Sequence, residues 1–467
     1  MGRTLIDKLW DEHVVADLGD GASLLYIDRV FLHERTGSVS LKELKAKGRA
    51  VRHRNHAFVT MDHIVDTFPG RSDNTLMPSG KDFITTTRAT ALDAGLTFFD
   101  ITDERQGIVH VVSAEQGITL PGFTQVCPDS HTCTLGALGA LAWGIGSTEG
   151  EHALATSTLA VTKPKTMRIV FGGKLGFGVT SKDLILHLIG RYTAAGGSGY
   201  AISFTGPAIS ALPQENRFTI CNMAVEFGAF SGVIPPDDTT FAYVEGRPYA
   251  PKGAAFDTAI KHWRTLADDA DATYDREIDI DCTAIKPTVT WGTSPGHTVA
   301  IDGAVPDPAT AGDAVTRTSM EKALQYMDVA PGTRVEGLKI DAAFIGSCTN
   351  SRLEDLRAVA QVVKGRKVAA GVKAVIVPGS TQVKKAAERE GLHTILTAAG
   401  FEWRESGCSM CFNAGGESMG ERWRVISSTN RNFENRQGPK TRTHLASPTT
   451  VAASALAGAI ADVRKLG

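Results

Sequence analysis

The chain has 467 residues, of which 42% are apolar and 21% are charged, and its formal net charge is −2. These values are ordinary for a folded globular protein, and at about 150 residues per domain the length allows two to four domains. The balanced charge carries no electrostatic footprint for nucleic acid, and no apolar stretch approaches the roughly 18–20 residues of a membrane span. Seven cysteines are too few for a disulfide scaffold, and their odd number fits reduced thiols in a cytoplasmic protein.

Strand and helix signals alternate along the chain, which is the pattern of an α/β fold. Thr180-Ser181 is a typical helix cap, and Gly391 can terminate a helix. The clearest predicted elements, in chain order, are a strand over Met167–Phe171, a helix over Lys182–Gly190, a strand over Asp341–Ile345, a helix over Glu354–Val363, a strand over Ala374–Val377 and a helix over Thr381–Glu390.

Three domains are expected, with boundaries near Pro164 and near Ile285, so that they span 1–164, 165–284 and 285–467. The segment Thr290–Asp313 is rich in Gly, Pro and Thr and is predicted to be a long loop. In parallel α/β sheets, the loops that follow the carboxyl ends of the strands carry the functional sites. Cys348, just after the strand predicted at Asp341–Ile345, lies in such a loop.

Histidines and acids occur as neighbours at several places in the first half of the chain. They are Asp62-His63, Asp129-Ser130-His131, His110 with Glu115 on a strand-like stretch Ile108–Ala114, and Asn222 with Glu226. A carboxylate beside an imidazole fixes its tautomer and raises its basicity, as proton transfer near neutral pH requires. Any one such pair is more often a structural histidine. Their number in glycine-rich loops favours a catalytic site, although spacing does not show that they converge.

Three cysteines carry most of the functional information. Cys348 lies in Gly346-Ser347-Cys348-Thr349-Asn350, and Cys408 and Cys411 form a C-x-x-C pair. A structural zinc site needs four protein ligands, whereas three thiolates suit a cubane iron–sulfur cluster with one open iron, which acts as a Lewis acid. A dithiol redox pair or an incidental structural pair is the alternative for Cys408 and Cys411. The remaining cysteines (Cys127, Cys133, Cys221 and Cys282) are expected to be buried apolar thiols.

The stretch Asn430–Arg436 contains two arginines five residues apart. Their guanidinium groups could bind carboxylates in the bidentate manner, and the alternative is a solvated polar loop.

These motifs resemble the aconitase superfamily, and most closely its isopropylmalate dehydratase branch. The resemblance runs along the whole chain and rests on Tyr26–Arg29, Asp62-His63, Asp129–Thr132, Thr219–Met223, Gly346–Asn350, the Cys408/Cys411 pair, Asn430–Phe433 and Thr443–Pro448. It implies three α/β domains packed around a central 4Fe-4S cluster. Aconitases carry a further swivel domain, which this sequence does not include. The resemblance therefore implies a separate small subunit that completes the active site.

The resemblance also implies a role for each matched residue. Cys348, Cys408 and Cys411 would hold the cluster, with one iron open. Asp62 and His63 would protonate the departing hydroxyl, while His110 pairs with Asp129 and His131 with Glu226. The residues expected to bind substrate are His33, Ser130, Asn222, Asn430, Arg431 and Arg436. The base and a further carboxylate-binding arginine would belong to the small subunit.

The implied activity is the isomerisation of a malate-type diacid, 2-isopropylmalate to 3-isopropylmalate, by dehydration and rehydration in leucine biosynthesis. A homoaconitase, or a citramalate or other alkylmalate dehydratase, is the alternative within the superfamily, because Arg35–Ser40 and Phe227–Gly232 depart from the isopropylmalate branch. A dithiol redox protein and an iron-sensing RNA binder are the alternatives from other classes. The balanced charge disfavours the RNA binder.

Overall fold

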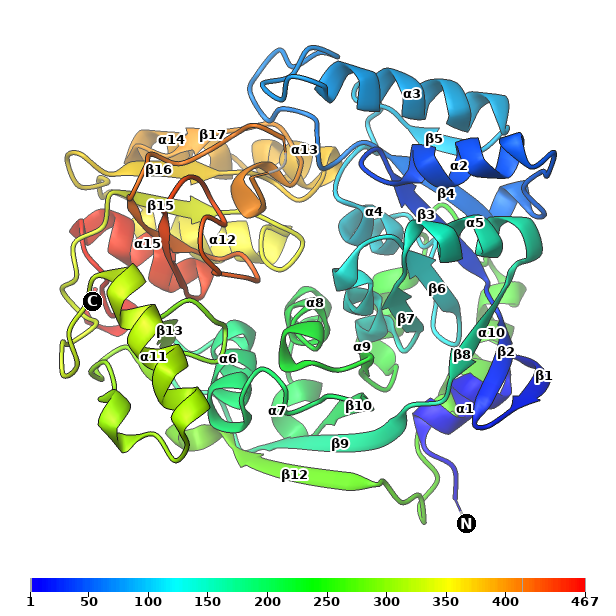
Figure 1. Ribbon diagram of the computed structural model, residues 1–467, viewed down its shortest axis with the longest axis horizontal. Helices are drawn as coiled ribbons and strands as arrows, with labels where there is room; N and C mark the ends of the chain where they lie inside the picture. Colours follow the sequence, from blue (N-terminus) through cyan, green and yellow to red (C-terminus); the bar gives the residue numbers. More distant parts are fainter. Residues whose placement is uncertain (1, 414, 467) are drawn as a thin grey trace. The chain divides into compact units, whose positions relative to one another are not determined.

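The computed structural model describes residues 2–413 and 415–466. Tertiary contacts divide this part of the chain into two compact units. Unit 1 comprises the chain up to Val65, Ser72–Gly173 and Gly197–Ile280, and unit 2 comprises Asp66–Arg71, Lys174–Gly196 and the chain from Asp281 onward. Each unit contains parallel sheets accompanied by helices (Figure 1), so the α/β class predicted from the sequence is confirmed.

Unit 1 is built on a five-stranded parallel sheet in the order β5-β4-β3-β6-β7. Its strands are β3 (Arg29–His33), β4 (Ala57–Thr60), β5 (Thr97–Phe99), β6 (Thr124–Cys127) and β7 (Leu141–Gly144). Helix α2 (Gly37–Ala46) packs against Leu32, whereas α4 (Val109–Glu115) packs Val109 and Val112 against Phe31. Consecutive strand residues face opposite sides of a sheet, so the two helices cover opposite faces. Helices α3 (Gly80–Asp93) and α5 (Ser147–Thr156) lie beside α2 (Figure 1).

The strand-like assignment of Ile108–Ala114 was wrong, because Ile108 caps helix α4 and the residues after it belong to that helix. Its valines favour a strand by local propensity, but the helix is buried from Val109 to Ala114, and tertiary packing overrides propensity. The Asp62 carboxylate accepts the Val109 N–H at 3.0 Å and so satisfies a donor at the helix start. This contact between distant parts of the chain leaves no local sequence signal.

Unit 1 also contains a second sheet in the order β11-β10-β9-β12 and a small antiparallel sheet in the order β1-β2-β8. The strand predicted at Met167–Phe171 is confirmed within β9 (Lys165–Gly172). The other strands are β1 (Val14–Gly19), β2 (Ala22–Tyr26), β8 (Thr158–Thr162), β10 (Tyr200–Thr205), β11 (Ser231–Val233) and β12 (Arg276–Asp281). The other helices are α1 (Leu5–Asp11), α7 (Pro207–Ser210), α8 (Gln214–Asn222), α9 (Asp238–Val244) and α10 (Ala254–Trp263).

Unit 2 is built on a five-stranded parallel sheet in the order β17-β16-β15-β18-β19. Its strands are β15 (Ala342–Ile345), β16 (Lys373–Ile376), β17 (Glu402–Trp403), β18 (Arg424–Ser427) and β19 (Arg442–Leu445). Its helices are α6 (Ser181–Tyr192), α11 (Ala314–Met327), α12 (Leu353–Val363), α13 (Thr381–Arg389), α14 (Leu392–Ala399) and α15 (Pro448–Ala457). The strands predicted near 341 and 374 and the helices predicted near 182, 354 and 381 are all confirmed, including the Thr180 cap of α6.

The predicted long loop Thr290–Asp313 is not wholly irregular. It contains a short antiparallel pair, β13 (Thr288–Thr290) with β14 (Thr298–Ala300). The buried His444 holds this pair to β19, because its Nδ1 lies 2.7 Å from the Thr290 carbonyl oxygen. Among the residues described, none of the helices has both the length and the apolar character needed to cross a membrane.

The short helical turns after β6 pack closely on the second sheet. These turns form η2 (Ser130–Leu138), and a Cβ on Gly136 would lie 1.8 Å from the Gly232 carbonyl oxygen of β11. Only glycine permits this approach of two backbones.

We predict that Gly136→Ala lowers the free energy of unfolding by about 2 kcal/mol, because the added methyl group must displace backbone rather than a flexible side chain. Gly312→Ala, at an exposed glycine with open space around it, is the matched control and should change it by less than about 0.5 kcal/mol. Urea unfolding of both variants measures the difference. Equal midpoints for Gly136→Ala and the wild type would contradict the prediction.

Candidate active site

The histidine and acid motifs of unit 1 follow three adjacent strands of the five-stranded sheet. His33 ends β3, Asp62-His63 follows β4, and Asp129-Ser130-His131 follows β6. Because β3 pairs in parallel with both β4 and β6, the three carboxyl ends meet at one edge of the sheet. The fold therefore brings together motifs that are up to about a hundred residues apart in the sequence.

His63 lies between two carboxylates. Its Nδ1 is 2.6 Å from Asp62 Oδ1, and its Nε2 is 3.2 Å from Asp129 Oδ2. Burial opposes ionisation of Asp62, but the charge and hydrogen bond of His63 lower the pKa of Asp62 below its usual range. The two carboxylates orient the imidazole and stabilise its protonated form.

Asp129 accepts hydrogen bonds from several imidazoles. His110 Nε2 lies 3.0 Å from its carboxylate, and the backbone N–H of His131 donates to it at 2.7 Å. Burial opposes ionisation, but His110, His131 and His63 together hold the pKa of Asp129 well below its usual range. Gly144 permits this arrangement, since a Cβ there would lie 2.6 Å from the Asp129 carbonyl oxygen. His131 Nε2 in turn contacts Glu226 Oε1 at 2.7 Å.

His33 stacks on His63, with ring centroids 4.3 Å apart. Its Nε2 lies 3.1 Å from the Pro128 carbonyl oxygen, so that nitrogen carries the proton and Nδ1 is left as a lone pair. Nδ1 is buried without a hydrogen-bond partner among the residues described. Burial and the neighbouring His63 lower the pKa of His33 to about 4, so the ring is neutral near pH 7.

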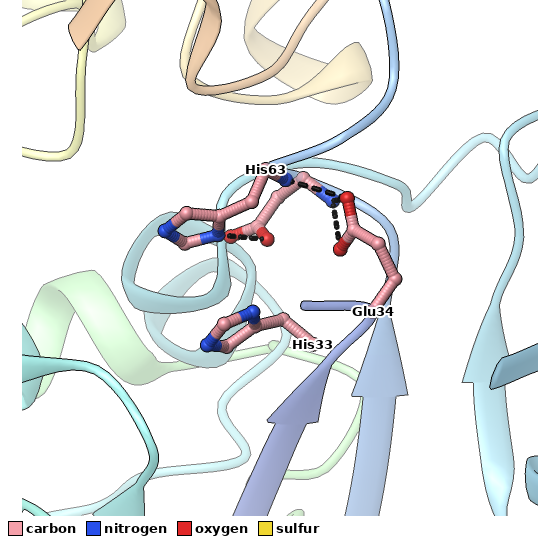
Figure 2. A group of neighbouring side chains, drawn as sticks. His33, Glu34 and His63 are labelled. Atoms are coloured by element: carbon pink, nitrogen blue, oxygen red, sulfur yellow. Dashed lines mark hydrogen bonds and ion pairs between the residues drawn. The ribbon is translucent and has the colours of Figure 1, made fainter. Parts of the chain in front are cut away.

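Glu34 belongs to this group, although the sequence reasoning did not select it. Its buried carboxylate accepts the backbone N–H groups of Asp62, His63 and Ile64, as Figure 2 shows for His63. Burial, followed by the charge of Asp62, raises the pKa of Glu34. A glutamate directly after a buried strand, next to a candidate histidine, was the available signal. His33, Glu34, Asp62 and His63 could also be taken for a cation site, but the carboxylate oxygens are already engaged by these donors.

Two further predicted residues have local partners in unit 1. Asn222, at the end of α8, donates from Nδ2 to Thr134 Oγ1 at 2.7 Å. Ser130 is exposed, and its hydroxyl lies 3.4 Å from His131 Nδ1.

The three candidate ligand cysteines lie in loops of unit 2. Cys348 follows β15. Cys408 precedes the one-turn helix η7 (Ser409–Cys411), which Cys411 ends, and the Cys411 N–H donates to the Cys408 carbonyl at 3.0 Å. Their exposed fractions are 6%, 7% and 6%. None of the seven cysteines, all within the described part of the chain, forms a disulfide, and the other four are buried as expected.

Asn430 joins two of these thiols. Its Nδ2 donates to Cys348 Sγ at 3.5 Å, and its Oδ1 lies 3.8 Å from Cys411 Sγ. Arg436 Nη2 lies 3.9 Å from Cys411 Sγ, and its guanidinium covers the ring of Phe412 at 4.6 Å. Arg436 Nε is buried and lacks a hydrogen-bond partner among the residues described. Arg431, on the same loop, is partly exposed.

A buried carboxylate that sequence reasoning missed also anchors the Cys408/Cys411 loop. Glu417 accepts hydrogen bonds from Ser409 Oγ at 2.6 Å and from Thr67 Oγ1 at 2.8 Å. Thr67 is further tied to the loop by its carbonyl, which accepts the Glu405 N–H at 2.7 Å. No motif marks this contact, because its partners are 350 residues apart.

The donor set of unit 2 fits an iron–sulfur cluster. The set contains three buried thiols, two of which contact Asn430, and the guanidinium of Arg436 lies beside Cys411.

A family model for the aconitase family (aconitate hydratase) matches residues 7–458. The chain belongs to the aconitase family, and this membership implies an iron–sulfur cluster. The 3-isopropylmalate dehydratase large subunit 1 of Bradyrhizobium diazoefficiens is 52% identical over 465 residues, which cover 100% of this chain and 97% of that protein. The holo-form of Thermococcus kodakaraensis aconitase X is a similar solved structure, at 11% identity and a TM-score of 0.47 over 92% of this chain and 89% of that one.

We predict that His33 makes the protein less stable in mild acid. The folded pKa is about 4, against an ordinary value of 6.5, so between these pH values the unfolded chain binds a proton that the folded chain does not. The free energy of unfolding therefore falls as the pH falls from 6.5 to 4, by about 3 kcal/mol for this group, and the loss levels off below pH 4.

His33→Gln, which cannot titrate, should remove this component. Denaturant unfolding of both proteins at pH 7 and at pH 4.5 gives the measurement, as the difference between their two pH dependences. If the free energy of unfolding depended on pH in the same way in both proteins, His33 would not be the source of the loss in acid.

Proposed function

We propose that the chain is the large, catalytic subunit of a 3-isopropylmalate dehydratase, which interconverts 2-isopropylmalate and 3-isopropylmalate through 2-isopropylmaleate in leucine biosynthesis. The observation that carries the proposal is 52% identity, over the full length of the chain, to a protein of that name. The proton-transfer group of unit 1 and the thiols of unit 2 supply the chemistry that such a reaction needs. The proposal includes three α/β domains, over 1–164, 165–284 and 285–467.

Cys348, Cys408 and Cys411 would hold one 4Fe-4S cluster with an open iron. When bound, the cluster supplies a Lewis acid for an oxygen of the diacid. Asn430 supports two of the thiolates by its contacts with Cys348 and Cys411. The guanidinium of Arg436 lies beside Cys411 and would neutralise part of the negative charge of the bound cluster.

His63 would protonate the departing hydroxyl. Asp62 holds its Nδ1, so the proton on Nε2 is the one available for transfer, and Asp129 stabilises that proton until it moves. In the rehydration step the same nitrogen takes the proton back from water. His110 and His131 keep Asp129 ionised and in place, and Glu226 holds the His131 ring.

Substrate binding would rest on His33, Ser130, Asn222, Asn430, Arg431 and Arg436. Arginine suits the substrate because its planar fork binds a carboxylate through two parallel hydrogen bonds. Arg436 has a buried Nε without a partner among the described residues, which leaves a donor for such a bond.

A small subunit would complete the active site and supply the base that removes the carbon-bound proton. The name of the relative, a large subunit matched over 97% of its length, supports this partner.

The test is reconstitution. The chain is purified without oxygen, its iron and sulfide are counted, and a small subunit is added with 2-isopropylmalate. We expect about four iron and four sulfide per chain, and activity only with both subunits present. Faster turnover of citramalate or homocitrate than of isopropylmalate would overturn the choice of substrate.

We predict that Cys348→Ser loses the cluster and all turnover while its circular dichroism stays that of the wild type, since a serine hydroxyl is a poor ligand for iron in a cluster. Cys282→Ser, which removes another buried thiol of unit 2, should keep the cluster and the activity. Retained visible absorption and turnover in Cys348→Ser would contradict its assignment as a ligand.

We also predict that Arg436→Lys raises the KM for the diacid about tenfold, the equivalent of one hydrogen bond to a charged group. A lysine ammonium cannot form the two parallel bonds of a guanidinium. Arg317→Lys, at an exposed arginine of α11, is the control and should leave KM unchanged. Initial-rate kinetics on the reconstituted enzyme measure both KM values. An unaltered KM in Arg436→Lys would show that Arg436 does not bind the diacid.

A further inference from the structure

Glu34 carries a fully buried carboxylate that is held by backbone amides alone. The N–H of His63 donates to Oε1 at 2.7 Å, that of Asp62 to Oε2 at 3.0 Å, and that of Ile64 to Oε1. Among the residues described, no lysine or arginine forms an ion pair with it. Burying a charge without a cationic partner is unfavourable, and three amide dipoles offset only part of that.

The amides that Glu34 binds belong to three consecutive residues, which form the turn after β4. This turn carries the Asp62–His63 pair, and Figure 2 shows the His63 imidazole and the Glu34 carboxylate on either side of its backbone. A neutral acceptor such as glutamine could hold part of the turn at a lower desolvation cost. The negative charge of Glu34 at this place therefore indicates that Glu34 acts electrostatically on His63 as well as anchoring the turn.

His63 is surrounded by carboxylates and other imidazoles. Asp62 and Asp129 contact its two ring nitrogens, and the neutral His33 ring stacks on it at 4.3 Å. The titratable groups around it are His33, Glu34, Asp62, Asp129 and the thiol of Cys127, whose pKa burial raises, with His110 and His131 behind Asp129. Of these carboxylates, only Glu34 binds the backbone of the His63 turn.

We propose that Glu34 is a positioning residue for the Asp62–His63 pair: it fixes the turn so that His63 Nδ1 meets Asp62, and its charge helps to keep His63 protonated. This inference rests on the proposed function, in which His63 delivers a proton to the departing hydroxyl. In this role Glu34 contacts neither substrate nor cluster. Its effect passes through the amides of residues 62–64.

Three variants of the reconstituted two-subunit enzyme separate the possibilities. Glu34→Gln removes the charge and replaces one acceptor oxygen with an amide NH2, which cannot accept a backbone N–H. Glu34→Asp keeps the charge on a shorter side chain that cannot hold all three amides. Asp28→Asn is the matched control, because Asp28 lies at the opposite end of β3 and its carboxylate also binds a histidine, His13 at 2.8 Å, and a backbone N–H, that of Thr124 at 2.8 Å.

For Glu34→Gln we expect kcat in the dehydration direction to fall about 10²-fold, because His63 is displaced, with KM changed less than about twofold. The alkaline limb of its kcat profile should move to lower pH by about one pH unit, since the imidazolium has lost a nearby negative charge. Glu34→Asp should lower kcat but keep the limb in place. Asp28→Asn should leave kcat and the alkaline limb unchanged, whatever its effect on the free energy of unfolding.

Hydrogen exchange gives a readout that does not depend on turnover. In the wild type, the amides of Asp62, His63 and Ile64 should be protected, and in Glu34→Gln they should exchange at least tenfold faster, with the strands β3 and β4 unchanged. A Glu34→Gln enzyme with wild-type exchange in this turn, or with normal kcat per cluster and an unmoved alkaline limb, would overturn the proposal.

Failure of the proposed function would look different. A wild-type enzyme that turns over a different diacid, or none, would refute the isopropylmalate assignment while Glu34→Gln still raised exchange in the turn. If the variant does not fold, Glu34→Asp carries the test, because a kcat and an exchange rate equal to those of the wild type would also refute the positioning role.

Discussion

The shared carboxylate of Asp129 is the interaction on which the proton-transfer group depends. It contacts the rings of His63 and His110 and the backbone of His131, and each of these comes from a different segment of unit 1. A single buried carboxylate would be costly, and a single buried imidazolium equally so. Together they stabilise one another, which is why burial fails to raise the pKa of Asp129. Removing one member would leave its partners with uncompensated charge.

This arrangement follows from the topology of the sheet. β3, β4 and β6 are adjacent and parallel, so the residues after each strand meet without any need for sequence proximity. The glycine at position 144, at the end of the neighbouring β7, lets the Asp129 backbone come close. The site is thus built on the ends of rigid strands, which holds the imidazoles in fixed orientations.

Much of unit 2 could be predicted from the sequence, because its strands are short apolar runs followed by clear helix caps. β15, α12, β16 and α13 all lie where the pattern places them. The motifs of the site could also be found, since cysteines, histidines and acids at short spacing are rare. Helix α4 could not be predicted correctly: its valines favour a strand, and the contacts that make it helical come from the sheet and from Asp62. Glu34 and Glu417 were missed for a related reason, as their partners are distant in the sequence.

The residues that were missed share one structural role. Three loops that carry reactive groups are anchored by a buried carboxylate outside the recognisable motif. Glu34 anchors the turn of His63, and Glu417 anchors the loop of Cys408 and Cys411. Asp355 anchors the loop of Cys348, where it accepts the Ser351 and Arg352 N–H groups at 3.0 and 3.1 Å. A carboxylate offers about four acceptor positions and can bind several donors of one turn at once, whereas a hydroxyl or amide oxygen offers about two. Burial raises the pKa of both Glu34 and Asp355. A raised pKa means that the folded chain favours the protonated form of these two groups, so their ionised carboxylates are held near pH 7 at a cost that the backbone hydrogen bonds offset in part.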